Sequence, residues 1–229
     1  MKISLKKVGF IALFYCIALF LKYYIVIINP EILNGTNLLV NSLLYGLGPL
    51  IGGLILIKLL KRQNDLSIFN AGLKQTILVL LIPLVLFTLL GLLNGNLDFL
   101  ALKVVAIAIL YAIIEEYGWR GYLQTELKDL NKYVKYIVIS VLWFFWHLEF
   151  DYSVVAYLII LAGSFGMGYV ADKSKSLIYV GLFHAFINIF LSAELNYIPF
   201  PQKLIIIVIS AVSIILLMRF NATKIIKKN

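Results

Sequence analysis

Charged residues are scarce in this chain of 229 residues: they make up 14% of it, whereas 62% of the residues are hydrophobic. The mean hydropathy is +0.99. A water-soluble domain needs polar side chains to cover its surface, and a chain of this composition cannot supply them. The scarcity of charge therefore excludes a soluble globular protein and indicates that lipid surrounds much of the outer surface.

Cysteine and histidine are rare as well. Cys16 is the only cysteine, so an intramolecular disulfide is excluded, and its position in an apolar run predicts a packing role. The two histidines, His147 and His184, both lie in apolar runs. The sequence also lacks internal repeats and linkers long enough to separate domains.

Long apolar runs are abundant instead. A helix needs about 20 mostly apolar residues to cross a bilayer. Candidate spans lie near residues 8–28, 38–60, 76–93, 99–122, 134–150, 153–171, 177–194 and 203–219. We therefore predict an all-α fold, a polytopic membrane helix bundle of about eight transmembrane helices. No small-residue cleavage site follows the first run, so we expect it to be an uncleaved span.

Positive charge is concentrated in alternate connections between these runs and at the chain ends. The basic residues of those connections and of the chain ends are Lys2, Lys6, Lys7, Lys58, Lys61, Arg62, Lys74, Arg120, Lys128, Lys132, Lys135, Lys173, Lys175, Arg219, Lys224, Lys227 and Lys228. The other connections hold Glu31, Asp98, Glu149, Asp151 and Glu194, with Lys203 as their only base. This positive-inside pattern predicts that both termini are cytoplasmic (N-in/C-in). The net charge of +9 then reflects topology and contact with anionic headgroups, and no nucleic-acid partner is expected.

Two features of the early runs concern packing. Gly48-x-x-x-Gly52, with Pro49 between them, predicts close helix packing with a kink. Lys22 and Lys103 are lysines within apolar runs, and we expect both to extend their ammonium groups toward a membrane interface.

The fourth run ends with Glu115, Glu116 and Arg120, and ionisable residues in a membrane helix are costly. On a helix, Glu116 lies one turn before Arg120, which is the favourable order for an ion pair. Glu115 points about 100° away, so it is expected to be left unpaired by anything local. A desolvated, unpaired carboxylate is a credible general base. A mobile-ion site or a polar seam between helices would use the same residues.

The two histidines favour the catalytic interpretation. His184 and Asn188 are four residues apart, so both side chains can donate hydrogen bonds to one point, as stabilisation of an oxyanion requires. Trp143 lies one turn before His147 and is expected to pack against its imidazole. Together with Glu115, the histidines predict a single catalytic site inside the bilayer.

This site can form only if the fourth helix continues past Arg120. If that helix runs to about Lys128, then with a rise of about 1.5 Å per residue Glu115 lies roughly 20 Å from the inner boundary. His147 would lie roughly 22 Å and His184 about 12 Å from the same boundary, a mismatch that tilt and kinks can absorb. Water is expected to enter through a protein-lined cavity, most simply from the cytoplasmic side.

In order and spacing, these residues resemble the motifs of a known family. E-E-x-x-x-R begins at Glu115, an aromatic-x-x-x-H pattern begins at Trp143, and H-x-x-x-N begins at His184. The three patterns look like those of the CAAX-protease and bacteriocin-processing (CPBP, Abi) family of intramembrane glutamic endopeptidases. The resemblance covers about residues 100–195. The second motif of the family usually begins with phenylalanine, and Trp143 keeps an aromatic ring there.

The resemblance divides the chain into three parts. Residues 1–98 are N-terminal transmembrane helices without a family motif. Residues 99–195 are the CAAX-protease-like catalytic core helices. Residues 196–229 are the final transmembrane helix and a basic cytoplasmic tail.

The resemblance also implies an activity, the hydrolysis of peptide bonds within the membrane. By resemblance, Glu115 and His147 activate the attacking water, whereas His184 and Asn188 hold the oxyanion. The residues that shape the site are Glu116, Arg120 and Trp143.

Zinc is the alternative to a metal-free mechanism. Glu115, His147 and His184 would suit zinc as ligands. However, the sequence lacks the H-E-x-x-H helix of many zinc proteases, and a Glu–Arg pair is awkward beside a cation. We therefore predict a glutamate-dependent endopeptidase without a cofactor, with a zinc metalloprotease as the alternative.

Two other functions would use the same residues. A proton-coupled small transporter could employ the glutamates and histidines as a relay, although carriers often show internal repeats and interrupted helices. A non-catalytic immunity protein could bind a peptide in the same cavity, although every motif residue is present.

The expected partners are the lipid bilayer and a peptide or protein substrate. The Lys-, Ile- and Asn-rich composition indicates a bacterium with an AT-rich genome. We therefore expect a multi-pass protein of the plasma membrane. It would process leader, bacteriocin-like or signalling peptides, or provide bacteriocin self-immunity.

Overall fold

A computed structural model describes residues 4–32, 38–68, 70, 72–97, 99–148 and 153–226. Within these residues the secondary structure is helical and contains no β-strand, which confirms the all-α prediction. Three acidic residues used in the charge argument, Asp98, Glu149 and Asp151, lie outside the described residues, as do Lys2, Lys227 and Lys228.

Each predicted span overlaps one long helix. The long helices are α1 (Leu5–Tyr23), α2 (Leu38–Leu59), α3 (Leu73–Leu93), α4 (Leu100–Glu116), α6 (Lys132–Trp146), α7 (Val154–Ser174), α8 (Leu177–Leu191) and α9 (Phe200–Ile226). Shorter helical segments are η1 (Tyr24–Ile28), η2 (Pro30–Ile32), η3 (Tyr117–Leu123), α5 (Gln124–Glu126) and η4 (Ala193–Leu195).

Four of these helices are long and apolar enough to cross a membrane. They comprise Val40–Leu59, Leu73–Leu93, Val154–Ser174 and Phe200–Leu217, and α8 is a shorter apolar helix. The chain is therefore a multi-pass membrane protein. The count of eight spans and the N-in/C-in orientation remain predictions.

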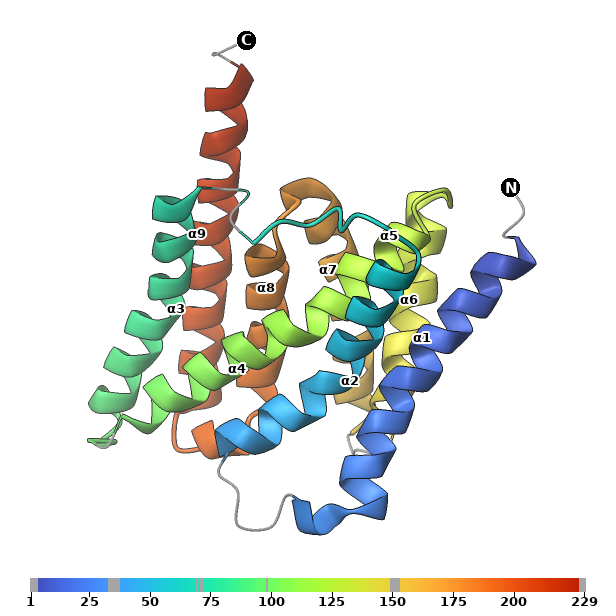
Figure 1. The fold of residues 1–229 in the computed structure, drawn as a ribbon. Coiled ribbons are helices and arrows are strands. Elements are labelled where there is room, and N and C mark those ends of the chain that lie inside the picture. Colours follow the sequence, from blue (N-terminus) through green and yellow to red (C-terminus); the bar gives the residue numbers. More distant parts are fainter. Residues whose placement is uncertain are drawn as a thin grey trace.

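The bundle has two chemically different ends. In Figure 1, α1 begins and α9 finishes at the same end, where α5 and the connection from α2 to α3 also lie. We call this the basic end, because Lys58, Lys61, Arg62, Lys128, Lys132, Lys173 and Lys175 belong to its helix termini and connections. The other end, which we call the opposite end, includes η2 and η4 with Glu31 and Glu194.

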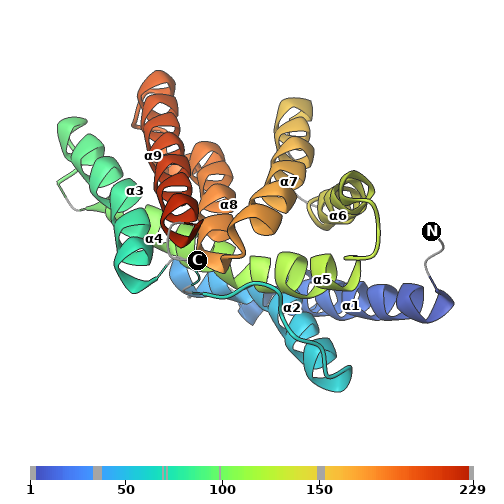
Figure 2. The ribbon, with the colours of Figure 1, turned by 90° about the horizontal axis from the view of Figure 1, so that it is seen from above.

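Helix α4 holds a central position, because it packs against α2, α3 and α8. Viewed from above in Figure 2, α1, α2, α4 and α5 form one layer, and α6, α7, α8, α9 and α3 follow one another beside it. One apolar core joins α3, α4, α8 and α9. A second joins α1, η3, α6 and α7. Ile113 and Phe183 pack against both cores, and the polar site lies where the two meet.

Close packing of α2 explains its glycines. Gly48 and Gly52 face α1, and a Cβ on Gly48 would lie 2.5 Å from the carbonyl oxygen of Ala18. On the α4 side, a Cβ on Gly118 would lie 2.2 Å from the carbonyl oxygen of Pro49. Close packing at Gly48 and Gly52 is thus confirmed. The packing role of Cys16 was wrong, since its side chain is exposed on α1.

Candidate active site

The fourth helix continues past Arg120, as the proposed site requires. Helix α4 passes directly into η3, a π-helical segment, and then into α5, which ends at Glu126. Wider π-helical winding is rare and frequently occurs at functional sites. Here it falls where Gly118 lets the chain approach the backbone of α2. The glutamates occupy the last turn of α4, and Arg120 lies within the π-helical segment.

Glu116 and Arg120 form the predicted ion pair. The Arg120 Nη1 atom lies 2.9 Å from one Glu116 carboxylate oxygen and 2.8 Å from the other, and neither side chain is exposed. The Nη2 atom donates to the carbonyl oxygen of Ser164 at 3.0 Å and to its hydroxyl at 2.6 Å. The guanidinium therefore compensates the charge of Glu116 and anchors α7 to the π-helical segment.

His184 lies between the two glutamates, a contact that the sequence reasoning missed. Its Nδ1 atom is 2.8 Å from Glu116 Oε1, and its Nε2 atom is 3.8 Å from Glu115 Oε2. All three side chains are fully buried. Because a carboxylate only accepts hydrogen bonds when ionised, Nδ1 carries the proton in the contact with Glu116. The imidazole thus joins α8 to α4 at the centre of the site.

Glu115 has two hydrogen-bond partners in the structure, although none was predicted for it. Tyr111, one helical turn earlier, donates its hydroxyl proton to Glu115 Oε1 at 2.5 Å. The indole Nε1 of Trp146 donates to the same oxygen at 3.2 Å. The prediction that nothing local pairs with Glu115 was therefore wrong, and the i, i+4 spacing of Tyr111 was the signal that could have corrected it. One oxygen of Glu115 is thus fixed, and the other faces His184.

His147 follows the last residue of α6 and packs against Trp143. The two ring centroids are 4.4 Å apart, and His147 Nδ1 lies 2.7 Å from the carbonyl oxygen of Trp143. A carbonyl oxygen only accepts, so Nδ1 donates, and in the neutral imidazole Nε2 is the basic nitrogen. Trp143 also packs against His184, because the centroids of these two rings are 5.0 Å apart. Trp143 therefore fixes both imidazoles.

A cavity of about 310 Å³ lies at the opposite end. Tyr111, His147 and Asn188 line it, with Ser42 and Glu194 among the other lining residues. In the described part of the chain, the amide nitrogen of Asn188 is buried and has no hydrogen-bond partner. The expected entry of water from the cytoplasmic side stays a prediction.

A second polar cavity, of about 330 Å³, lies at the basic end and reaches Arg120. Lys128, Lys135 and Asp172 also line it. Asp172 accepts hydrogen bonds from Lys135 at 2.7 Å, from Tyr136 at 2.6 Å and from Gln124 at 2.9 Å. The buried pair of Glu116 and Arg120 therefore stands between this cavity and the one at the opposite end.

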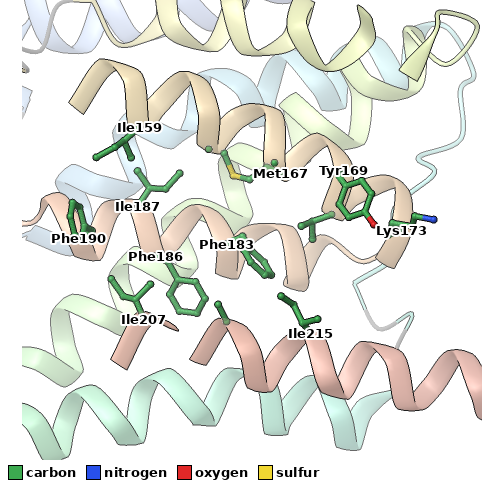
Figure 3. Close-up of a pocket in the computed structure, with 14 residues that line it drawn as sticks. Ile159, Met167, Tyr169, Lys173, Phe183, Phe186, Ile187, Phe190, Ile207 and Ile215 are labelled. Atoms are coloured by element: carbon green, nitrogen blue, oxygen red, sulfur yellow. The ribbon is translucent and has the colours of Figure 1, made fainter. Parts of the chain in front are cut away.

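A third cavity is apolar, and none of the polar-site residues lines it. It has a volume of about 710 Å³ and lies between α7, α8 and α9. Figure 3 shows Phe183, Phe186 and Ile207 pointing into it, with Lys173 at one end. None of its lining residues is acidic.

The alternative zinc ligands are not assembled in this structure. Among the described residues, no group of three or more histidine, cysteine, aspartate or glutamate side chains is arranged to hold a metal ion. His184 instead contacts Glu116, and the Nδ1 atom of His147 is engaged by the backbone. We therefore derive no chemical step through a metal.

Lys22 contradicts the expectation that it reaches a membrane interface. Its side chain is only 1% exposed, and its ammonium group donates to the carbonyl oxygen of Trp146 at the end of α6. The ammonium also lies 4.1 Å from the centroid of the Trp146 ring. By contrast, Lys103 is exposed on α4, and its extension to an interface stays a prediction. The sequence did not reveal that a neighbouring helix end offers Lys22 a partner.

Comparison with known proteins places the polar site inside a family match. Residues 97–190 match the family model described as type II CAAX prenyl endopeptidase, Rce1-like. No curated protein matches the chain. The matched segment contains every predicted catalytic residue, namely Glu115, His147, His184 and Asn188. The match confirms the resemblance seen in the sequence and identifies residues 97–190 as similar to the Rce1-like CAAX proteases, a family of intramembrane endopeptidases.

Proposed function

We propose that this protein is a glutamate-dependent intramembrane endopeptidase that hydrolyses peptide bonds of membrane-associated peptides or proteins. The observation that carries the proposal is the pair of buried carboxylates on either side of His184 within the matched segment. One carboxylate is neutralised by Arg120, and the other has an oxygen directed at the imidazole. Two adjacent carboxylates in different environments suit different roles in acid–base chemistry.

In the proposed reaction, Glu115 takes a proton from a water molecule that the basic nitrogen of His147 helps to orient. The resulting hydroxide attacks the peptide carbonyl carbon, and the carbonyl oxygen becomes an oxyanion. The Asn188 amide is a buried donor without a partner in the described residues, and it donates to the oxyanion together with a protonated His184. The C–N bond then breaks as the amine takes up the proton held by Glu115. One water and one peptide bond thus yield a carboxylate and an amine.

The proposed substrates are leader, bacteriocin-like or signalling peptides at a bacterial plasma membrane, including peptides against which the cell needs immunity. The Lys-, Ile- and Asn-rich composition supports a bacterial source. The test is cleavage-site mapping by mass spectrometry on membranes that carry the wild-type protein or a Glu115 variant. New peptide termini that require the intact glutamate support the proposal, and an identical set of termini in both membranes contradicts it.

A proton-coupled transporter is the second candidate, because the structure has a polar cavity toward each end of the bundle with ionisable residues between them. A carrier would move protons across proteoliposomes in the presence of its solute and release no peptide fragments. Peptide fragments without solute-driven proton uptake would decide in favour of the endopeptidase.

The side from which the substrate enters can be tested with cysteine labelling. Cys16 is exposed, so it is first replaced by alanine. Ser42→Cys then places a thiol in the cavity at the opposite end, and Lys128→Cys places one in the cavity at the basic end. With an N-in/C-in orientation, a membrane-impermeant maleimide labels Cys at position 42 in intact cells, and labels position 128 only after permeabilisation. The reverse pattern would show that the site faces the cytoplasm.

Metal dependence gives a further prediction. After purification in the presence of a strong chelator, peptide cleavage is expected to persist, because the described residues offer no assembled ligand set. The measurement is the rate of peptide release with the residual zinc content determined in the same sample. Loss of cleavage on chelation, with recovery on addition of zinc, would establish the alternative mechanism.

A further inference from the structure

Lys22 is a buried charge that the proposed reaction leaves without a role. It lies on α1, outside the segment that matches the family. Placing an ammonium group inside a membrane protein is costly, and such residues are usually functional or paired. An apolar residue would fill the same space without that cost, so the retained charge requires a reason.

The contacts of Lys22 converge on the end of α6. Its ammonium group donates to the carbonyl oxygen of Trp146, which is the last residue of that helix. The final carbonyl groups of a helix lack intrahelical donors and carry partial negative charge, so a cation stabilises them. The same ammonium lies over the Trp146 ring, which adds a cation–π contact. Lys22 thus holds both the backbone and the side chain of Trp146.

Trp146 connects this contact to the proposed general base. Its indole N–H donates to Glu115 Oε1, and the next residue in the chain is His147. A change at Lys22 is therefore transmitted to both groups that would activate water.

We infer that Lys22 is a positioning residue of the active site: it fixes Trp146 and the end of α6 so that the indole orients Glu115 and His147 faces the cavity. This inference rests on the proposed endopeptidase function. It assigns a part of the site to the N-terminal helices, which carry no family motif. The whole of α1 would then serve as a support for the catalytic helices.

The test compares three single variants. Lys22→Met keeps an unbranched side chain of similar length but removes the charge, and Lys22→Arg keeps charge and donors. Lys103→Met removes the exposed lysine on α4 and serves as the matched control. Because small misplacements of catalytic groups can cost about 100-fold in rate, Lys22→Met is expected to lower kcat by about 10- to 100-fold with little change in KM. Arginine should restore most of the rate, and Lys103→Met should match wild type.

Trp146→Phe tests the same connection between Lys22 and Glu115 from the side of Trp146. It keeps an aromatic ring for the cation but removes the N–H that donates to Glu115. If Lys22 acts in part through the indole of Trp146, the double variant Lys22→Met/Trp146→Phe should lose less rate than the product of the two single losses, because both changes interrupt the connection to Glu115. Rate losses that multiply in the double variant would overturn the inference, as would wild-type kcat in Lys22→Met.

A readout independent of activity separates this inference from the proposed function. The chain has only two histidines, and His147 lines a cavity whereas His184 is fully buried. Modification of His147 by diethylpyrocarbonate can therefore be followed by mass spectrometry. Lys22→Met should change its rate, and Lys22→Arg should not. An unchanged rate in Lys22→Met contradicts the positioning role, whereas absence of cleavage by the wild-type protein contradicts the endopeptidase proposal alone.

Discussion

Replacing Glu115 by glutamine is expected to abolish peptide cleavage while the protein remains folded. Glutamine has nearly the same shape, and its carbonyl oxygen can still accept the hydrogen bonds from Tyr111 and Trp146. It cannot take a proton from water. General-base catalysis contributes about 10²- to 10⁴-fold to a rate, so the loss of turnover should be of that order or larger. The measurement is peptide release from membranes, with thermal unfolding in detergent as the test of folding.

A matched variant distinguishes loss of the base from loss of any acidic side chain. Glu31→Gln makes the same chemical change at an exposed residue of η2 and should cleave at the wild-type rate. Undiminished turnover by Glu115→Gln would contradict the proposed enzyme function, because this variant removes the proposed base and keeps the shape of the side chain.

Replacing Arg120 by alanine is expected to lower both stability and activity. Removal of one member of a buried ion pair leaves the other charge uncompensated and costs about 3–5 kcal/mol. Here the uncompensated group is Glu116, and the hydroxyl and carbonyl of Ser164 lose their donor as well. Activity should fall because His184, held by Glu116, loses a fixed partner. Thermal unfolding in detergent and peptide release provide the two measurements.

The surface ion pair of Lys7 and Asp129 supplies the control for Arg120. Both side chains are more accessible to solvent than the buried pair, and exposed ion pairs contribute little to stability. Lys7→Ala should therefore unfold at nearly the wild-type temperature. If Arg120→Ala unfolded at the same temperature as Lys7→Ala and wild type, the stabilising role assigned to the buried pair would be wrong.

The correct predictions about the site came from residues that are four apart on one helix. The ion pair of Glu116 and Arg120 follows from a separation of four residues on one helix, which is the same wherever the helix lies. The contact between Trp143 and His147 follows from the same rule. The apolar runs located the helices well, because burial in lipid imposes a minimum length on each of them.

Contacts between helices distant in sequence could not be read in the same way. The position of His184 between two glutamates depends on how α8 meets α4, and the chain between them offers no spacing rule. Lys22 is a second contact of this kind, and here the sequence led to a wrong prediction. Its expected route to an interface assumed a lipid-facing side chain, whereas the end of α6, supplied from far along the chain, presents a carbonyl group and an indole to it.

The separation of the two polar cavities has an electrical consequence. If the two cavities open to opposite sides of the membrane and fill with water, most of the transmembrane voltage falls across the packed layer that contains Glu116, Arg120 and His184. Moving one elementary charge through the full voltage involves about 2.3 kcal/mol per 100 mV, so proton movements at this layer are coupled to the energised state of the cell. The same layer would then also separate the water on the two sides, because the ion pair of Glu116 and Arg120 within it is buried.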